Sequence, residues 1–141
     1  MKPDASKEAS RWLRQAREDL ADARYAMVGG RWHLACFLAQ QSAEKAIKAF
    51  LYAQSGELVR GHSVAELCGE AARIDQDFTA LKIVAGPLDR FYIPTRYPDS
   101  LPGGIPAEAF TAADAEGAAR AAELTVERVT AKIAPAENEQ K

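Results

Sequence analysis

Apolar residues recur at every third or fourth position over long stretches of this chain, which is the spacing of one helix face. The first stretch predicts a helix over about 6–28 that ends at Gly29-Gly30, because glycine readily takes the left-handed conformation that closes a helix. The second predicts a helix over about 31–55, in which small side chains form a stripe that lets another helix approach closely. The stripe consists of Ala35, Ala39, Ser42, Ala46, Ala49 and Ala53.

Capping signals divide the second half of the chain into further helices. Ser63 and Glu66 form a capping box, whose side chains bond the free backbone N–H groups of a helix start, and a third helix is predicted from there to about residue 74. Asp77 is expected to cap a fourth helix. Pro87 should bend or divide that helix, because proline cannot continue the helical hydrogen bonds.

A segment rich in proline and glycine over 93–110 precedes the last predicted helix. It is too long for a plain turn in so small a domain, and loops of this size are often functional. Thr111 and Asp114 form a second capping box, and Pro135 is expected to end the helix that begins there.

No alternating pattern of useful length predicts a strand. The fold class is therefore all-α, and the economical architecture is an up-down antiparallel helical bundle of about five helices. We expect a single domain over 1–134 and a flexible tail over 135–141.

The composition narrows the classes of function. The chain has 141 residues, of which 48% are hydrophobic and 27% charged, as in an ordinary globular domain. A formal net charge of −2 excludes a strongly basic nucleic-acid binder that relies on counterion release. No apolar run approaches the roughly 20 residues that a membrane span needs, so we expect a cytoplasmic protein without membrane contact.

Motifs for common cofactors and metals are missing from the sequence. It has no glycine-rich phosphate loop, no nucleophile elbow and no His-Glu metal helix, so neither a cofactor nor a metal site is predicted. Cys36 and Cys68 each lie among apolar residues, and we interpret them as two buried thiols in a reducing compartment.

A polar group occupies one face of the second predicted helix. Its members are Gln41, Glu44, Lys45 and Lys48. Glu44 and Lys48 are four residues apart, which suits a simple surface ion pair. The alternative is an interface, or a phosphate contact made by Lys45 and Lys48. Large apolar residues in line with these charges indicate that another element or a partner chain covers part of this face: Leu34, Phe37 and Leu38.

Two further features offer phosphate-binding chemistry. His62 precedes the cap of the third helix, where it either packs on the helix start or binds a phosphate and transfers a proton, since a helix N-terminus attracts anions. Tyr92 and Tyr97 flank Arg96 between prolines, and such rings with a guanidinium can stack a base and fork onto a phosphate. The same residues can instead anchor the long loop, with Arg96 paired to Asp99 or to the glutamate of the second helix.

Three segments together resemble the signature blocks of the HEPN family, in the same order: 41–49, 61–63 and 92–99. The resemblance extends over about 8–131 and is to small prokaryotic stand-alone members. It implies a helical bundle that usually forms homodimers, with a nucleotide-binding cleft. It also implies frequent pairing with a small nucleotidyltransferase, often in toxin–antitoxin modules. Carried over by position, the residues expected to bind the ligand are Lys45, Lys48, His62, Arg96 and Tyr97.

Many HEPN members resemble metal-independent ribonucleases, in which an arginine is followed after four to six residues by a catalytic histidine. This chain lacks that sequential motif, because no arginine stands at the required distance before either histidine, His33 or His62. The positions in question hold Ala26, Met27, Val28, Ser55, Gly56 and Glu57. His33 is instead expected to serve packing or to lie at the surface.

The leading hypothesis is thus a non-catalytic subunit that binds a nucleotide or RNA, or that partners a nucleotidyltransferase. The first alternative is a ribonuclease that uses an atypical pair of His62 and Arg96 as catalytic residues. The second is a structural dimerisation module. All three hypotheses require that the chain brings the face of Lys45, the turn of His62 and the loop of Arg96 into one shared cleft.

Overall fold

The structure, a computed structural model, describes residues 4–55, 57 and 59–139, and all regular elements in these ranges are helices. There are six α-helices and two short 3₁₀ helices (η) in this part of the chain. They are α1 (Ala5–Val28), α2 (Trp32–Ser55), α3 (Val64–Ala72), α4 (Asp77–Ala85), η1 (Gly86–Phe91), η2 (Pro98–Ser100), α5 (Pro106–Ala109) and α6 (Ala112–Glu139). The predicted all-α bundle is confirmed. None of the helices described is long and apolar enough to cross a lipid bilayer.

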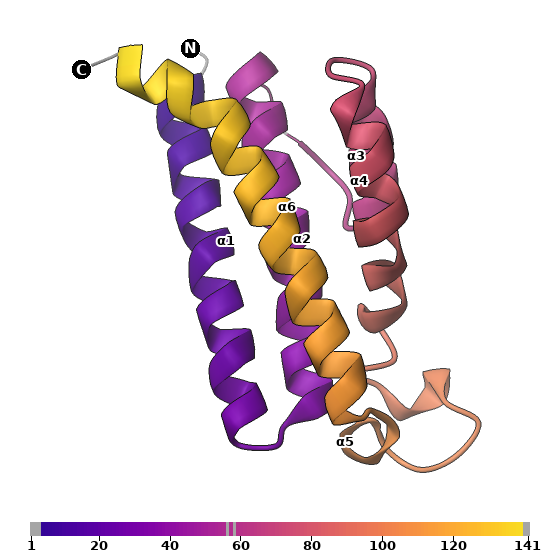
Figure 1. Ribbon diagram of the computed structural model, residues 1–141. Coiled ribbons are helices and arrows are strands. Elements are labelled where there is room, and N and C mark those ends of the chain that lie inside the picture. Colours follow the sequence, from indigo (N-terminus) through magenta and orange to yellow (C-terminus); the bar gives the residue numbers. More distant parts are fainter. Residues whose placement is uncertain (1–3, 56, 58, 140–141) are drawn as a thin grey trace.

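The three longest helices, α1, α2 and α6, lie side by side, and the α3–α4 hairpin packs beside them (Figure 1). One connection is a crossover instead of a hairpin: the chain between α2 and α3 returns along the bundle, so these two helices point the same way (Figure 1). As a result the turn before α3 lies next to the middle of α2, where the side chain of Gln40 bonds the carbonyl oxygen of His62.

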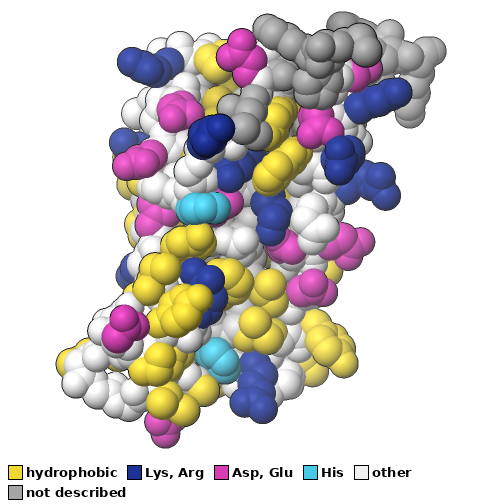
Figure 2. Space-filling view, turned by 180° about the vertical axis from the view of Figure 1, so that it is seen from behind, with side chains coloured by type: hydrophobic (Ala, Val, Ile, Leu, Met, Phe, Trp, Pro, Cys, Tyr) yellow, Lys and Arg dark blue, Asp and Glu magenta, His cyan; other side chains and the backbone are white. Residues whose placement is uncertain are grey.

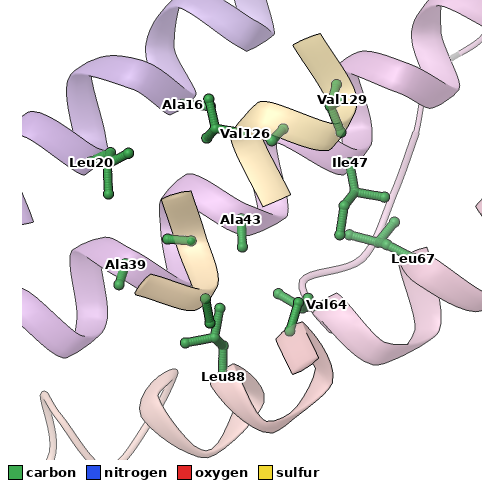
Figure 3. Packing of buried hydrophobic residues seen from close by; sticks show 14 of the residues in the cluster. Ala16, Leu20, Ala39, Ala43, Ile47, Val64, Leu67, Leu88, Val126 and Val129 are labelled. Carbon is green, nitrogen blue, oxygen red and sulfur yellow. The ribbon is translucent and has the colours of Figure 1, made fainter. Parts of the chain in front are cut away.

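The stripe of small residues on α2 lets the neighbouring helices approach closely, as predicted. Ala39, Ala46 and Ala49 are fully buried, and Ser42 donates its hydroxyl proton to the Ala16 carbonyl oxygen of α1 at 2.7 Å. Larger side chains such as Ile47 fill the space toward α3 and η1 (Figure 3). Because protein interiors are packed to crystal-like density, this arrangement fixes the rotation of α2 and therefore the direction of its polar face.

The local signals for helix starts and stops are mostly confirmed. The Ser63 hydroxyl oxygen accepts from the Glu66 N–H at 3.1 Å, and Thr111 and Asp114 bond each other's backbone N–H at 2.9 and 3.2 Å. Pro87 divides its helix, since α4 ends at Ala85 and continues as η1. Such a change to 3₁₀ geometry is expected where a proline removes an α-helical hydrogen bond.

Two predictions about element ends are wrong. Asp77 does not cap α4: it is the first residue of the helix, and the Asp75 side chain accepts its N–H at 3.0 Å. The connection over 93–110 contains two short helices, η2 and α5. Pro135 does not end the last helix, because α6 continues to Glu139. A proline removes helical hydrogen bonds only locally, so it can bend a helix without ending it. The flexible tail over 135–141 stays a prediction.

Candidate functional site

Glu44 lies at the centre of the polar face of α2 and is only 3% exposed. Its Oε2 accepts from Lys48 Nζ at 3.2 Å and lies 3.4 Å from His62 Nδ1. Its Oε1 lies 3.5 Å from the amide nitrogens of both Gln40 and Gln41. The pair of Glu44 and Lys48 therefore exists, but it is buried and not the surface pair that the sequence suggested. A carboxylate taken out of water needs partners of this kind, because burying it unpaired is very costly.

Both lysines predicted to bind a ligand are engaged inside the fold. The Lys48 side chain is 6% exposed, and its ammonium lies 5.4 Å from the ring centroid of Trp12. Lys45 Nζ lies 2.5 Å from Asp19 Oδ2 of α1, with 22% of its side chain exposed. A phosphate would have to compete with Asp19 or Glu44 for these ammonium groups.

The turn before α3 holds His62 against the polar face of α2. Gly61 has a φ of +97°, a conformation that other residues rarely adopt, and it lets the chain reverse direction here. The imidazole stacks on the ring of Tyr92, with centroids 5.1 Å apart and planes 17° from parallel. Its side chain remains 60% exposed, so one part of the ring faces solvent.

The N-terminus of α3 is filled by a carboxylate of the protein itself. Asp89 of η1 accepts the N–H groups of Val64 at 2.6 Å and Ala65 at 3.1 Å, and the hydroxyl of Ser63 at 2.7 Å. The anion that the sequence led us to expect at this helix start is thus internal. Asp89 was not among the predicted site residues, because no local pattern marks a side chain whose hydrogen-bond partners lie 24 to 26 positions away.

Arg96 is held over aromatic rings, and no carboxylate is among its contacts in the part of the chain that the structure describes. Its guanidinium carbon lies 4.5 Å from the ring centroid of Phe37, 4.7 Å from that of Tyr92 and 5.2 Å from that of Tyr97. Its Nε donates to the Tyr92 carbonyl oxygen at 2.8 Å. The alternative in which Arg96 pairs with Asp99 or with the α2 glutamate is not realised.

A shallow groove of about 370 Å³ runs past Arg96 between α2 and α5. Its lining includes His33, Phe37, Thr95 and Ile105. Burial, and secondarily the charge of Arg31, lower the pKa of His33 below its ordinary value, so this imidazole is neutral at pH 7. His33 Nδ1 is buried without a hydrogen-bond partner, a feature that no local pattern in the sequence indicates.

The predicted site residues fall into two groups. His62, Arg96 and Tyr97 belong together, since His62 and Arg96 both contact the Tyr92 ring and Arg96 also contacts Tyr97. Lys48 is connected to this group only indirectly, because Glu44 contacts both Lys48 and His62. Lys45 turns toward α1 and lines a separate open groove of about 530 Å³. The single cleft expected to unite Lys45, His62 and Arg96 is therefore not formed, and only the turn of His62 and the loop of Arg96 lie together.

Residues that could hold a metal do not gather anywhere in the described ranges, where no three His, Cys, Asp or Glu side chains form a candidate site. The thiols of Cys36 and Cys68 are free and buried, as predicted. Burial raises the pKa of each thiol to about 12, which leaves them protonated and unreactive near neutral pH.

Comparison with known proteins places this arrangement in a family. A family model described as HEPN domain matches residues 9–133. The protein TT1696 from Thermus thermophilus is similar in structure, with a TM-score of 0.80 and 38% sequence identity over 89% of this chain and 98% of that one. ST0689, an archaeal HEPN homologue, aligns with a TM-score of 0.74 and 39% identity over the same shares of the two chains. No curated protein matches. With the match spanning nearly the whole chain, we conclude that this protein belongs to the HEPN domain family.

Proposed function

We propose that this protein is a non-catalytic subunit that binds a nucleotide or RNA at the cluster of His62, Tyr92, Arg96 and Tyr97. The observation that carries the proposal is the state of Arg96: its guanidinium is exposed, oriented by three rings, and not neutralised by a carboxylate among the residues described. Because none of the described acidic side chains pairs with it, this cation is available to an anionic ligand.

The chemistry of these side chains suits one nucleotide. A guanidinium forks onto a phosphate through two parallel N–H bonds, and the Nε bond of Arg96 to the backbone pre-orients it for that contact. Histidine and tyrosine rings stack unpaired bases, a contact that is worth about 1–3 kcal/mol per base. The half-exposed ring of Tyr97 and the open part of His62 are accessible for such stacking.

The binding test is isothermal titration with a panel of nucleotides and short single-stranded RNA. We expect measurable heat with the parent protein and at least a roughly tenfold loss of affinity in Arg96→Gln. Arg11→Gln is the matched control, because Arg11 is an exposed arginine on α1 that pairs with Glu8. If no nucleotide or RNA binds, or if Arg96→Gln binds as well as the parent, the proposal is wrong.

Dimerisation is the second part of the proposal. Hydrophobic groups gather on part of the face of the molecule opposite α6 (Figure 2). Leu34 and Ile105 line the groove beside Arg96, and Ile93 precedes Arg96 by three residues in the sequence. The exposed fractions are 42% for Leu34, 41% for Ile93 and 49% for Ile105. Since monomeric proteins rarely leave such a cluster in water, we assign this surface to a second copy of the chain.

The oligomeric state tests this assignment. Light scattering on the purified protein should give the mass of two chains, and Ile105→Glu should give the mass of one because it places a charge in the interface. Ile83→Glu on α4 is the control, since Ile83 is equally apolar, 76% exposed and not part of the lining of the groove beside Arg96. A monomeric parent protein would refute the proposed homodimer. If such a monomer co-purifies with a nucleotidyltransferase, the surface would be assigned to that partner. A dimer without any ligand would favour the structural module.

One observation also favours a second candidate function, that of a metal-independent ribonuclease. His62 and Arg96 both contact Tyr92, so a proton carrier and a cation that can stabilise phosphoryl charge lie in the same cluster. Incubation of the pure protein with RNA in EDTA tests it. Cleavage that His62→Ala abolishes would establish an enzyme, whereas intact RNA, or equal cleavage by His62→Ala, would eliminate this candidate.

A further inference from the structure

We infer that the site recognises its ligand through a single phosphate and one unpaired base, as in a nucleoside monophosphate or one nucleotide of a single-stranded RNA. This inference rests on the proposed binding function and names the ligand class within it. The number of phosphates that this site can neutralise depends on which of its basic groups are already occupied.

Both lysines near the site, Lys45 and Lys48, are already paired with carboxylates. Lys48 is buried, and its ammonium lies between the Glu44 carboxylate and the Trp12 ring. Releasing it to bind a phosphate would leave Glu44 as an uncompensated buried charge, which is strongly unfavourable. Lys45 is bonded to Asp19, a residue that is itself 5% exposed, so the same argument applies to it.

The N-terminus of α3 is the second group. Helix N-termini often bind phosphates through their free N–H groups. Here Asp89 already accepts the N–H groups of Val64 and Ala65, and it is fixed by the Ser63 hydroxyl as well. A phosphate at this position would have to displace a carboxylate that is covalently part of the same fold.

Arg96 remains, and its geometry suits one phosphate. The Nε–H is used by the Tyr92 carbonyl oxygen, which leaves the two terminal nitrogens to form a fork. The ring of His62 stacks on Tyr92 and lies against Glu44, and because 60% of the side chain is exposed, it offers a platform for the base beside that fork. A second or third phosphate would find no free cation among the groups of this cluster, because the nearby Lys48 ammonium is already paired with Glu44.

Titration of the intact protein with AMP, ADP and ATP, without divalent metal, tests the inference. We expect dissociation constants within about threefold of one another, and much weaker binding of inorganic phosphate, which lacks the base. If ATP binds roughly tenfold or more tightly than AMP, the site engages further phosphates and the inference is overturned. If none of the three binds, and RNA does not bind either, the proposed function itself fails.

A salt series with a short single-stranded RNA gives an independent readout and separates the two sources of the nucleotide. The slope of log K against log[salt] is about −0.7 per phosphate neutralised on a single strand. We expect a slope of about −0.7 per bound copy of the protein, and near zero in Arg96→Gln if that variant retains any affinity. A slope of about −2 or steeper would show that several basic groups contact the backbone and would overturn the inference. AMP binding without RNA binding would assign the site to free mononucleotides.

Discussion

At the scale of single residues, the candidate site depends on a difference between charges that are paired inside the protein and one that is not. Glu44 and Lys48 neutralise each other out of contact with water, whereas Arg96 is exposed and contacts rings but none of the described carboxylates. Charged side chains therefore serve different purposes in this protein. The buried pair fixes the polar face of α2, and the exposed guanidinium is the group that we propose binds a ligand.

Because Glu44 and Lys48 form a buried pair, we expect Glu44→Gln to lower the free energy of unfolding strongly. This change leaves the Lys48 ammonium buried without its carboxylate, and breaking such a pair typically destabilises a protein by about 3–5 kcal/mol. Urea denaturation should show this loss in the free energy of unfolding. The control is Glu8→Gln, which breaks the exposed pair with Arg11 and should cost less than about 0.5 kcal/mol. Equal effects of the two substitutions would contradict the assigned role of Glu44.

At the scale of elements, the site is assembled where α2, the start of α3 and η1 meet. The Gln40 side chain connects α2 to the His62 carbonyl oxygen, and Asp89 connects η1 to the first turn of α3. Since η1 leads directly into Tyr92 and then Arg96, these hydrogen bonds hold the histidine and arginine parts of the site in register.

Asp89→Ala is expected to loosen this junction. It removes the acceptor of three hydrogen bonds, so we expect a loss of about 1–3 kcal/mol in unfolding free energy. The ring-current shift of the His62 protons, measured by NMR, should also decrease because the imidazole no longer stacks firmly on Tyr92. Asp4→Ala removes the local cap of α1 and is the matched control: it should lower stability and leave the His62 signal unchanged. An unaltered His62 signal in Asp89→Ala would refute the coupling.

At the scale of the whole molecule, the long helices α1, α2 and α6 form a tightly packed core, and the α3–α4 hairpin completes it. The small side chains of α2 bring the long helices close, and both cysteines, Cys36 on α2 and Cys68 on α3, are enclosed in the core. A property of the global fold, its stability at high pH, follows from that enclosure.

Because the two thiols are buried, we expect the folded protein to lose stability above about pH 9. The pKa of Cys36 and Cys68 is raised from 9.0 to about 12 in the folded protein, mainly by burial. The native state therefore keeps its thiol protons where the unfolded chain releases them. This contribution is fully present below about pH 9 and declines as the pH rises toward about 12. Thermal unfolding across roughly pH 8–10.5 should show the decline, and a thiol reagent at about pH 8 should label neither cysteine until urea unfolds the chain. Rapid labelling of the native protein would contradict this.

Much of the fold follows from the sequence alone. The periodicity of apolar residues, the glycine turn at Gly29-Gly30 and the capping residues Ser63 and Thr111 predict the long helices to within a few positions. They do so because each signal acts over three or four residues, within one turn of helix. Local signals were less reliable at Asp77 and Pro135, where a neighbouring residue or the rest of a long helix decided the outcome.

The sequence by itself thus determined the helices, the small-residue stripe and the set of side chains that could contact a ligand. Only the tertiary structure decided which of those side chains are available. Asp19 pairs with Lys45, which is 26 positions away in the sequence, and Glu44 contacts His62, which is 18 positions away. Asp89, which follows the α3–α4 hairpin, accepts hydrogen bonds from the N-terminus of α3. Pairings at such distances depend on the rotation and packing of whole helices, which no local pattern of residues specifies.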